Sequence, residues 1–224
     1  MSEIPLTDIL SLLWFMLVWI GYTWYADYVA HRRRSLRAVM HAHRYRWMLQ
    51  MLTRENRMTD VNILHTLQQS VSFFASATLL IIAGLLTILG SSDRAIEVVR
   101  ALPFAATSSL VQWELKLLVL SFIFVYAFFK FTWSLRQFNY CAVLIGAAPA
   151  VKDKEYARRA ADVSTNASKD FNQGLRAYYL SLATLAWFIS PWMFMVATTL
   201  VAIIMYLREY HSATMEMLEP SASE

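Results

Sequence analysis

The sequence has too few charged residues, glycines and cysteines for several common classes of protein. Charged side chains make up 16% of its 224 residues, whereas an ordinary soluble domain carries about 25%. The five glycines offer little material for a phosphate-cradling loop. The single cysteine, Cys141, excludes an intramolecular disulfide framework and a metal site with several thiolate ligands.

Catalytic and metal-binding motifs are also missing. The sequence has no Gly-x-Ser-x-Gly elbow, no glycine-rich phosphate loop, no His-Glu-x-x-His and no paired carboxylates in a supporting context. His41 and His43 are two residues apart, so on a helix they point to different sides and do not form a metal pair. No histidine lies deep in an apolar segment, which argues against haem. We therefore predict a protein without enzymatic activity, metal or cofactor.

Long apolar segments dominate what the sequence does contain. Hydrophobic residues make up 58% of the chain, and they concentrate in four blocks at about 6–29, 63–90, 115–135 and 177–207. Each block is near or above about 18 residues, the length that indicates a transmembrane helix. Helices buried in a soluble protein seldom exceed about 14 residues. The sequence thus predicts an all-α polytopic membrane protein, a four-helix bundle in one domain over residues 1–224.

Basic residues between the blocks predict the orientation in the membrane. The connections at about 30–62 and 136–176 are rich in arginine and lysine, whereas the connection between them offers only Arg94 and Arg100. Positively charged loops stay in the cytoplasm. Both basic connections are therefore predicted to be cytoplasmic, and both termini to lie on the opposite side.

The first basic connection has the pattern of an amphipathic helix. Residues 33–58 contain neither glycine nor proline, and Arg37, His41 and Arg44 face away from a cluster of apolar residues. Such a helix can lie on the inner leaflet, where Arg33, Arg37 and Arg44 would contact anionic lipid at about 1 kcal/mol each. Alternatively, it extends the bundle into the cytoplasm and packs on its neighbours.

The third and fourth blocks continue beyond what a bilayer requires. At about 1.5 Å per residue, a helix over 177–207 exceeds a hydrocarbon core of about 30 Å. Pro191 should kink this helix, because proline removes a backbone donor and crowds the preceding turn. The third block continues in a helical pattern through Tyr140 toward Pro149. We expect cytoplasmic helical extensions and a bent fourth span.

Ionisable residues inside the predicted spans are candidate functional residues, because burying charge in lipid is costly. Asp27 and Lys130 lie near the inner ends of the first and third spans, at similar predicted depth, and could form an ion pair. Alternatively, Lys130 extends its ammonium group to the interface and Asp27 ends its helix. Glu114 and Lys116, at the outer end of the third span, are expected to be exposed.

The second span carries a run of small residues, among which Ser72 and Ser76 share a helical face. Small residues let helix backbones approach each other closely in a membrane. We expect this face to pack within the bundle or against another copy of the chain. The alternative is a pore lined by hydroxyl groups, with Gln68 and Gln69 at its cytoplasmic mouth.

Several runs of residues together resemble one family. They are Arg54–Met58, Ser72–Ser76, Phe128–Phe131, Asn139–Tyr140 with Leu144–Pro149, and Gly174–Tyr179. These runs look like the bacterial membrane proteins of domain-of-unknown-function family 599, and the likeness covers most of the chain. The resemblance implies a bacterial inner (cytoplasmic) membrane protein, which would place both termini in the periplasm. It implies no catalytic or binding residue, because the family has no established activity.

These patterns lead to one principal expectation about function and one alternative. The principal expectation is a non-enzymatic accessory or scaffold component whose spans associate through small residues. The basic residues lie beside apolar spans, so anionic lipid headgroups are expected as partners and nucleic acid is not. The alternative is a homo-oligomeric channel or small transporter that uses Ser72, Ser76, Asp27 and Lys130.

Overall fold

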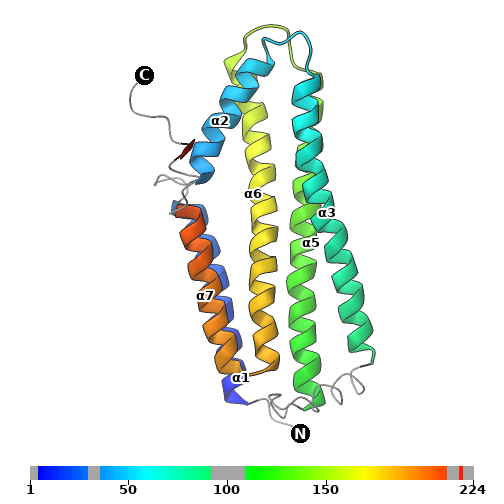
Figure 1. The fold of residues 1–224 in the computed structure, drawn as a ribbon, viewed down its shortest axis with the longest axis vertical. Coiled ribbons are helices and arrows are strands. Elements are labelled where there is room, and N and C mark those ends of the chain that lie inside the picture. Colours follow the sequence, from blue (N-terminus) through cyan, green and yellow to red (C-terminus); the bar gives the residue numbers. More distant parts are fainter. Residues whose placement is uncertain (1–4, 30–35, 92–108, 211–216, 219–224) are drawn as a thin grey trace.

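The computed structural model describes residues 5–29, 36–91, 109–210 and 217–218. The described residues form long α-helices and one 3-10 turn and contain no strand, so the predicted all-α fold is confirmed (Figure 1). The elements are α1 (Leu6–Val29), α2 (Leu36–Met51), α3 (Met58–Leu89), α5 (Leu110–Gly146), α6 (Lys154–Leu185), η1 (Ala186–Phe188) and α7 (Pro191–Tyr210).

Local sequence signals explain where the central helices begin. Ser109 and Gln112 form a capping box at the start of α5, each side chain bonding the other residue's backbone N–H. The Asp153 carboxylate accepts hydrogen bonds from the backbone N–H groups of Glu155 and Tyr156 at the start of α6. Pro191 is the first residue of α7, a position where its missing N–H costs no helical hydrogen bond.

Three long helices, α3, α5 and α6, run side by side along the bundle (Figure 1). α5 packs between α3 and α6, while α1 and α7 lie together beside the lower part of α6 and α2 covers its upper part. Four helices, α1, α3, α5 and α7, are long and apolar enough to cross a membrane. The predicted membrane fold is supported, although its fourth apolar helix begins later than expected.

The predicted fourth span, 177–207, is two helices and not one kinked helix. α6 ends at Leu185, and after the turn α7 begins at Pro191 and runs back in the opposite direction (Figure 1). Ser190 still bonds Ala186 through its backbone N–H, but Pro191 has no N–H with which to continue the helix. The predicted loop at 136–176 is correspondingly helical, since it holds the end of α5 and most of α6.

The hairpin of α6 and α7 also bears on the predicted topology. α7 runs parallel to α1, because Phe15 contacts Phe194 near one end and Tyr25 contacts Tyr210 near the other. α1 therefore begins at the lower end of the bundle, whereas α7 ends partway up, beside the lower end of α2 (Figure 1). This arrangement differs from the predicted one, in which 177–207 was a single crossing and both termini lay on the same side.

Labelling of introduced cysteines should report this arrangement. We expect Gln50→Cys and Met217→Cys to react with a membrane-impermeant maleimide from the same side of sealed vesicles, and Leu6→Cys from the opposite side. All three native side chains are exposed, whereas Cys141 is buried and should stay unlabelled. Reaction of Leu6→Cys and Met217→Cys from the same side would contradict the structure.

α2 is an extension of the bundle, the second of the two arrangements considered for this segment. Its Met48 and Met51 side chains are fully buried. His41 Nδ1 lies 3.0 Å from the Thr165 hydroxyl of α6. α2 therefore packs on α6, and Arg44 bonds Ser168 of that helix.

Candidate functional site

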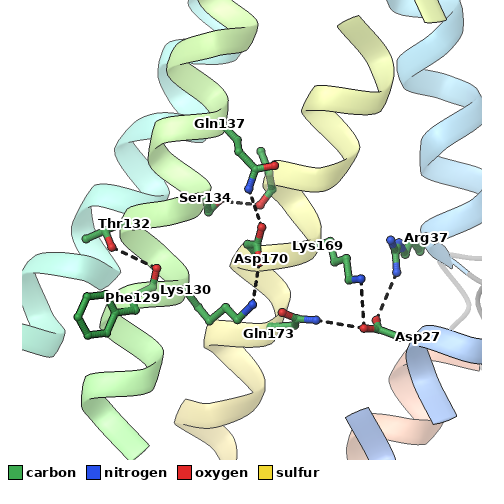
Figure 2. Close-up of polar contacts among 11 residues, drawn as sticks. Asp27, Arg37, Phe129, Lys130, Thr132, Ser134, Gln137, Lys169, Asp170 and Gln173 are labelled. Carbon is green, nitrogen blue, oxygen red and sulfur yellow. Dashed lines mark hydrogen bonds and ion pairs between the residues drawn. The ribbon is translucent and has the colours of Figure 1, made fainter. Parts of the chain in front are cut away.

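A network of charged and amide side chains connects α1, α2 and α6 (Figure 2). Its first centre is the carboxylate of Asp27, near the end of α1. Arg37 Nη1 lies 3.4 Å from Oδ1 of Asp27, and Lys169 Nζ lies 3.2 Å from Oδ2. Gln173 Nε2 donates a hydrogen bond of 3.2 Å to the same Oδ2 atom. One carboxylate therefore serves two cations from different helices.

The second centre of the network is Asp170 on α6, which joins α6 to α5 (Figure 2). Lys130 Nζ lies 3.0 Å from Oδ1 of Asp170, and Gln137 Nε2 donates to Oδ2 at 2.5 Å. The Ser134 hydroxyl adds a bond of 2.7 Å to the backbone carbonyl of Ala167. This pair is mostly sheltered, because the side chains of Lys130 and Asp170 are 28% and 14% exposed.

The structure gives Asp27 and Lys130 other partners than the sequence predicted. Lys130 pairs with Asp170, and Asp27 pairs with Arg37 and Lys169. The partners of the two residues, Lys169 and Asp170, are consecutive residues of α6. The pairing was missed because Lys169 and Asp170 were assigned to a cytoplasmic loop, whereas they lie within a helix of the bundle.

Two cavities flank this network. An apolar groove of about 510 Å³ extends along α1 from Asp27 and is lined by Met16, Trp19, Ile20, Thr23, Trp24 and Tyr126. A smaller cavity of about 90 Å³ lies between α2 and α6 and contains the predicted lipid contacts Arg37 and Arg44. The Arg44 guanidinium donates a 2.8 Å hydrogen bond to Ser168 of α6. Arg33, the third predicted lipid contact, lies outside the described residues.

A buried ion pair lies at the end of the bundle where α1 and α5 begin, where the sequence predicted an exposed lysine. Lys116 Nζ lies 3.4 Å from Asp8 and donates a 3.0 Å hydrogen bond to the carbonyl of Trp187. Trp187 Nε1 in turn bonds Asp8 at 2.5 Å. Lys116 is 2% exposed because the turn between α6 and α7 covers it. This pair holds α1, α5 and that turn together.

The small residues of α3 divide between its two faces. Val71, Ala75 and Thr78 are buried against the bundle, whereas Ser72 and Ser76 are exposed on the outer side. Ser72 and Ser76 therefore do not pack inside the bundle, which was one of the two expectations for them. Gln68, proposed for a pore mouth, bonds Asn139 of α5 at 2.7 Å.

No metal centre is evident in the part of the chain that the structure describes. Those residues contain no group of three or more His, Cys, Asp or Glu side chains that could hold a metal ion. Cys141 is fully buried in the hydrophobic core.

The runs of residues that carry the family resemblance have structural roles. The Arg57 guanidinium donates hydrogen bonds to the carbonyls of Ile145, Ala148 and Pro149, at 3.1, 2.8 and 3.3 Å. It therefore satisfies carbonyl groups at the end of α5, which have no helical partner. Asp60 accepts a hydrogen bond from the guanidinium of Arg54. The runs Arg54–Met58 and Leu144–Pro149 therefore hold the upper ends of α3 and α5 together.

The other runs meet in an aromatic cluster between α3, α5 and α6. The Phe74 ring lies 5.6 Å from that of Phe131 and 5.8 Å from that of Tyr178. The Tyr178 hydroxyl lies 2.8 Å from that of Thr78. Gly174 lies against the Phe131 ring, so closely that a Cβ atom there would be 2.5 Å from a ring carbon. The resemblance thus rests on residues that pack the helices together.

Comparison with known proteins identifies the family but no activity. The search of curated proteins and the search of solved structures gave no match. One family model, described as "Protein of unknown function, DUF599", matches residues 10–214. This match covers α2, α3, α5, α6 and α7 completely and confirms the resemblance inferred from the sequence. The chain belongs to the DUF599 family of proteins of unknown function.

Proposed function

We propose that this protein is a non-enzymatic accessory or scaffold component of a bacterial inner membrane, and that it associates with other membrane helices through the outer face of α3. The observation that carries the proposal is the exposure of Ser72 and Ser76 on a helix apolar enough to cross a membrane. The hydrocarbon chains of lipids cannot form hydrogen bonds with these hydroxyl groups, whereas a neighbouring helix can.

α3 lies at the edge of the bundle and packs mainly against α5. Gln69, Ser72 and Ser76 occupy successive turns of its exposed face, and Ala83 and Gly84 continue the small residues toward the other end. A Cβ atom added at Gly84 would meet no other atom within 4 Å. This face therefore has the small side chains that allow close approach of a second helix.

The arrangement of the charged groups supports a non-enzymatic role. A general acid or base must reach a substrate proton. In the network, however, Asp27 and Asp170 are held by Arg37, Lys169 and Lys130 on neighbouring helices. The same contacts stabilise the junction of α1, α2, α5 and α6, which suits a structural component.

The positive-inside rule supports an orientation for this component. α2 carries Arg37, Arg44 and Arg46 and lies at the upper part of the bundle in Figure 1, which we assign to the cytoplasm. The beginning of α1 would then lie in the periplasm, and the end of α7 would lie on the cytoplasmic side.

Disulfide or bis-maleimide cross-linking in native membranes tests the association. We expect Ser72→Cys and Ser76→Cys to give adducts of one defined size, because their side chains would face the partner helix. Val196→Cys, an equally outward position on α7 with 60% exposure of the native side chain, is the control and should remain uncross-linked. The native Cys141 is buried and should contribute no background.

The size of the adduct identifies the partner, since twice the chain mass indicates a second copy and any other mass a different protein. A result in which Ser72→Cys and Ser76→Cys remain as monomers as completely as Val196→Cys would contradict the proposal. A homo-oligomeric channel or small transporter is the alternative, favoured by the same exposed hydroxyl groups. It requires, in addition, that vesicles containing the pure protein conduct ions.

A further inference from the structure

The small cavity between α2, α6 and α7 has the composition of an anion-binding site. Its volume is about 90 Å³, well above the space that a single water molecule needs. Three cationic side chains, those of Arg37, Arg44 and Lys169, line it together with the polar groups of Thr165, Ser168 and Asn172. Glu209 is the one carboxylate among the described residues that line it.

Among the described residues, positive charge exceeds negative charge around this cavity. Arg37 and Lys169 share the single carboxylate of Asp27, at 3.4 and 3.2 Å. Glu209 pairs at 3.9 Å with a further cation, Arg176. The carboxylates of Asp27 and Glu209 are thus already engaged by cations other than Arg44.

Arg44 has no carboxylate partner in the part of the chain that the structure describes. It is half-buried and bonds the neutral hydroxyl of Ser168, and no described Asp or Glu lies within ion-pair distance of its guanidinium. Burial lowers the pKa of Arg44 from its ordinary value, and the positive charge of Arg37 lowers it further. The guanidinium nevertheless stays charged at neutral pH. A partly buried charge without a counter-ion is unfavourable, and a bound anion would relieve the penalty.

We propose that this cavity binds a phosphate group, with Arg44 as its principal ligand and Arg37 and Lys169 beside it. A guanidinium presents parallel N–H donors that match the oxygen spacing of phosphate. Hydroxyl and amide groups of Thr165, Ser168 and Asn172 line the same space and can take further oxygens.

The position of the cavity indicates where the phosphate comes from. The apolar part of α1 ends at Asp27, and α7 ends at Tyr210 next to Glu209. The cavity is therefore at the level where membrane spans end and phospholipid headgroups lie. Leu36 and Met40 complete its wall with apolar surface. An anionic phospholipid headgroup and a free phosphate ion present the same phosphate oxygens to the cavity. Separate titrations with each, described below, distinguish them. The proposal is independent of the association through α3.

Ligand-dependent thermal unfolding of the full-length protein in detergent tests the proposal. The wild type, Arg44→Gln and Arg46→Gln are each titrated with phosphatidylglycerol, and separately with inorganic phosphate at constant ionic strength. Arg46 is the matched control, because it is an exposed arginine on the same helix outside the cavity. We expect the apparent affinity to fall about tenfold or more in Arg44→Gln, since bonds to charged groups are lost, and to be unchanged in Arg46→Gln.

The unfolding midpoint without ligand separates binding from a structural role. We expect Arg44→Gln to be at least as stable as the wild type when neither ligand is present, because the variant removes a charge that lacks a counter-ion. Arg44→Lys keeps the charge without the guanidinium fork and should bind with intermediate affinity; it replaces Arg44→Gln if that variant does not fold.

Each result decides the proposal. A shift with phosphatidylglycerol alone that depends on Arg44 supports a lipid headgroup, and an equal shift with inorganic phosphate supports a free phosphate. If neither ligand stabilises the wild type more than Arg44→Gln, the site does not exist. A loss of stability in Arg44→Gln that is the same with and without ligand would show that Arg44 serves only to hold α2 on α6.

Discussion

Replacement of Asp170 by alanine is expected to lower the free energy of unfolding by about 3 kcal/mol, the lower end of the range for breaking a buried ion pair. Asp170 accepts from Lys130 and Gln137 of α5, and its removal leaves the Lys130 ammonium without that partner between two helices. The lower end applies because the Lys130 side chain is 28% exposed and water offsets part of the penalty. Unfolding in mixed micelles with increasing denaturing detergent measures the change.

Two further variants show whether the loss of stability in Asp170→Ala comes from the unpaired charge of Lys130. Asp162→Ala removes a carboxylate of the same helix that is 44% exposed and lies 3.7 Å from Arg158, so it should cost less than about 1 kcal/mol. The double variant Lys130→Met with Asp170→Leu should recover most of the stability, because it leaves no unpaired charge. Equal effects of Asp170→Ala and Asp162→Ala would show that the Lys130 pair contributes little.

Replacement of Gly174 by valine is expected to cost about 3 kcal/mol, the upper end of the range for overpacking a core. The first added carbon would lie 2.5 Å from one ring carbon of Phe131 and 2.8 Å from two others. Phe131 cannot turn aside, because it is fully buried and packs against the rings of Phe74, Phe171 and Tyr178. The helices α5 and α6 would have to separate. The same micelle unfolding assay measures the loss.

Gly21 provides the matched control for this substitution. It lies within α1, and a Cβ atom added there would meet nothing within 4 Å. Gly21→Val should therefore change stability by no more than about 0.5 kcal/mol, as is usual at a surface position. A second test uses Gly174→Ala, for which Phe131→Leu should make part of the space. The double variant should then lose less stability than the sum of the losses in the two single variants. Similar losses for Gly174→Val and Gly21→Val would indicate that valine in the helix, and not the Phe131 ring, is responsible.

Much of the fold could be predicted from hydropathy, but α6 could not. α1, α3 and α5 appear in the sequence as long apolar blocks, and the structure places helices over all three. α6 is amphipathic and polar on average, so a search for apolar segments passes over it. A signal was present in the small buried residues Ala157, Ala160, Ala161, Ser164 and Ala167, which recur at helical spacing and indicate a close helix contact.

The candidate site could be predicted only in part for the same reason. Asp27 and Lys130 stood out as charges inside apolar blocks, and both belong to the network. Their partners Lys169 and Asp170 lie in a polar segment whose sequence resembles an ordinary loop. Only the structure shows that this segment is a helix packed along α5. Arg37 and Arg44 were recognised as anion contacts, whereas Lys169 and Ser168 of the same cavity were not.

The mixed character of α6 has a consequence for how the chain enters the bilayer during synthesis. Lys169, Asp170 and Gln173 find their partners on α1 and α5, which are made earlier. Transfer of a helix with such side chains from the insertion machinery into lipid would cost considerable free energy. We therefore expect α6 to wait until α7 has emerged and the two to insert as one hairpin against the helices already in place. The last third of the chain would then depend on the first for its integration.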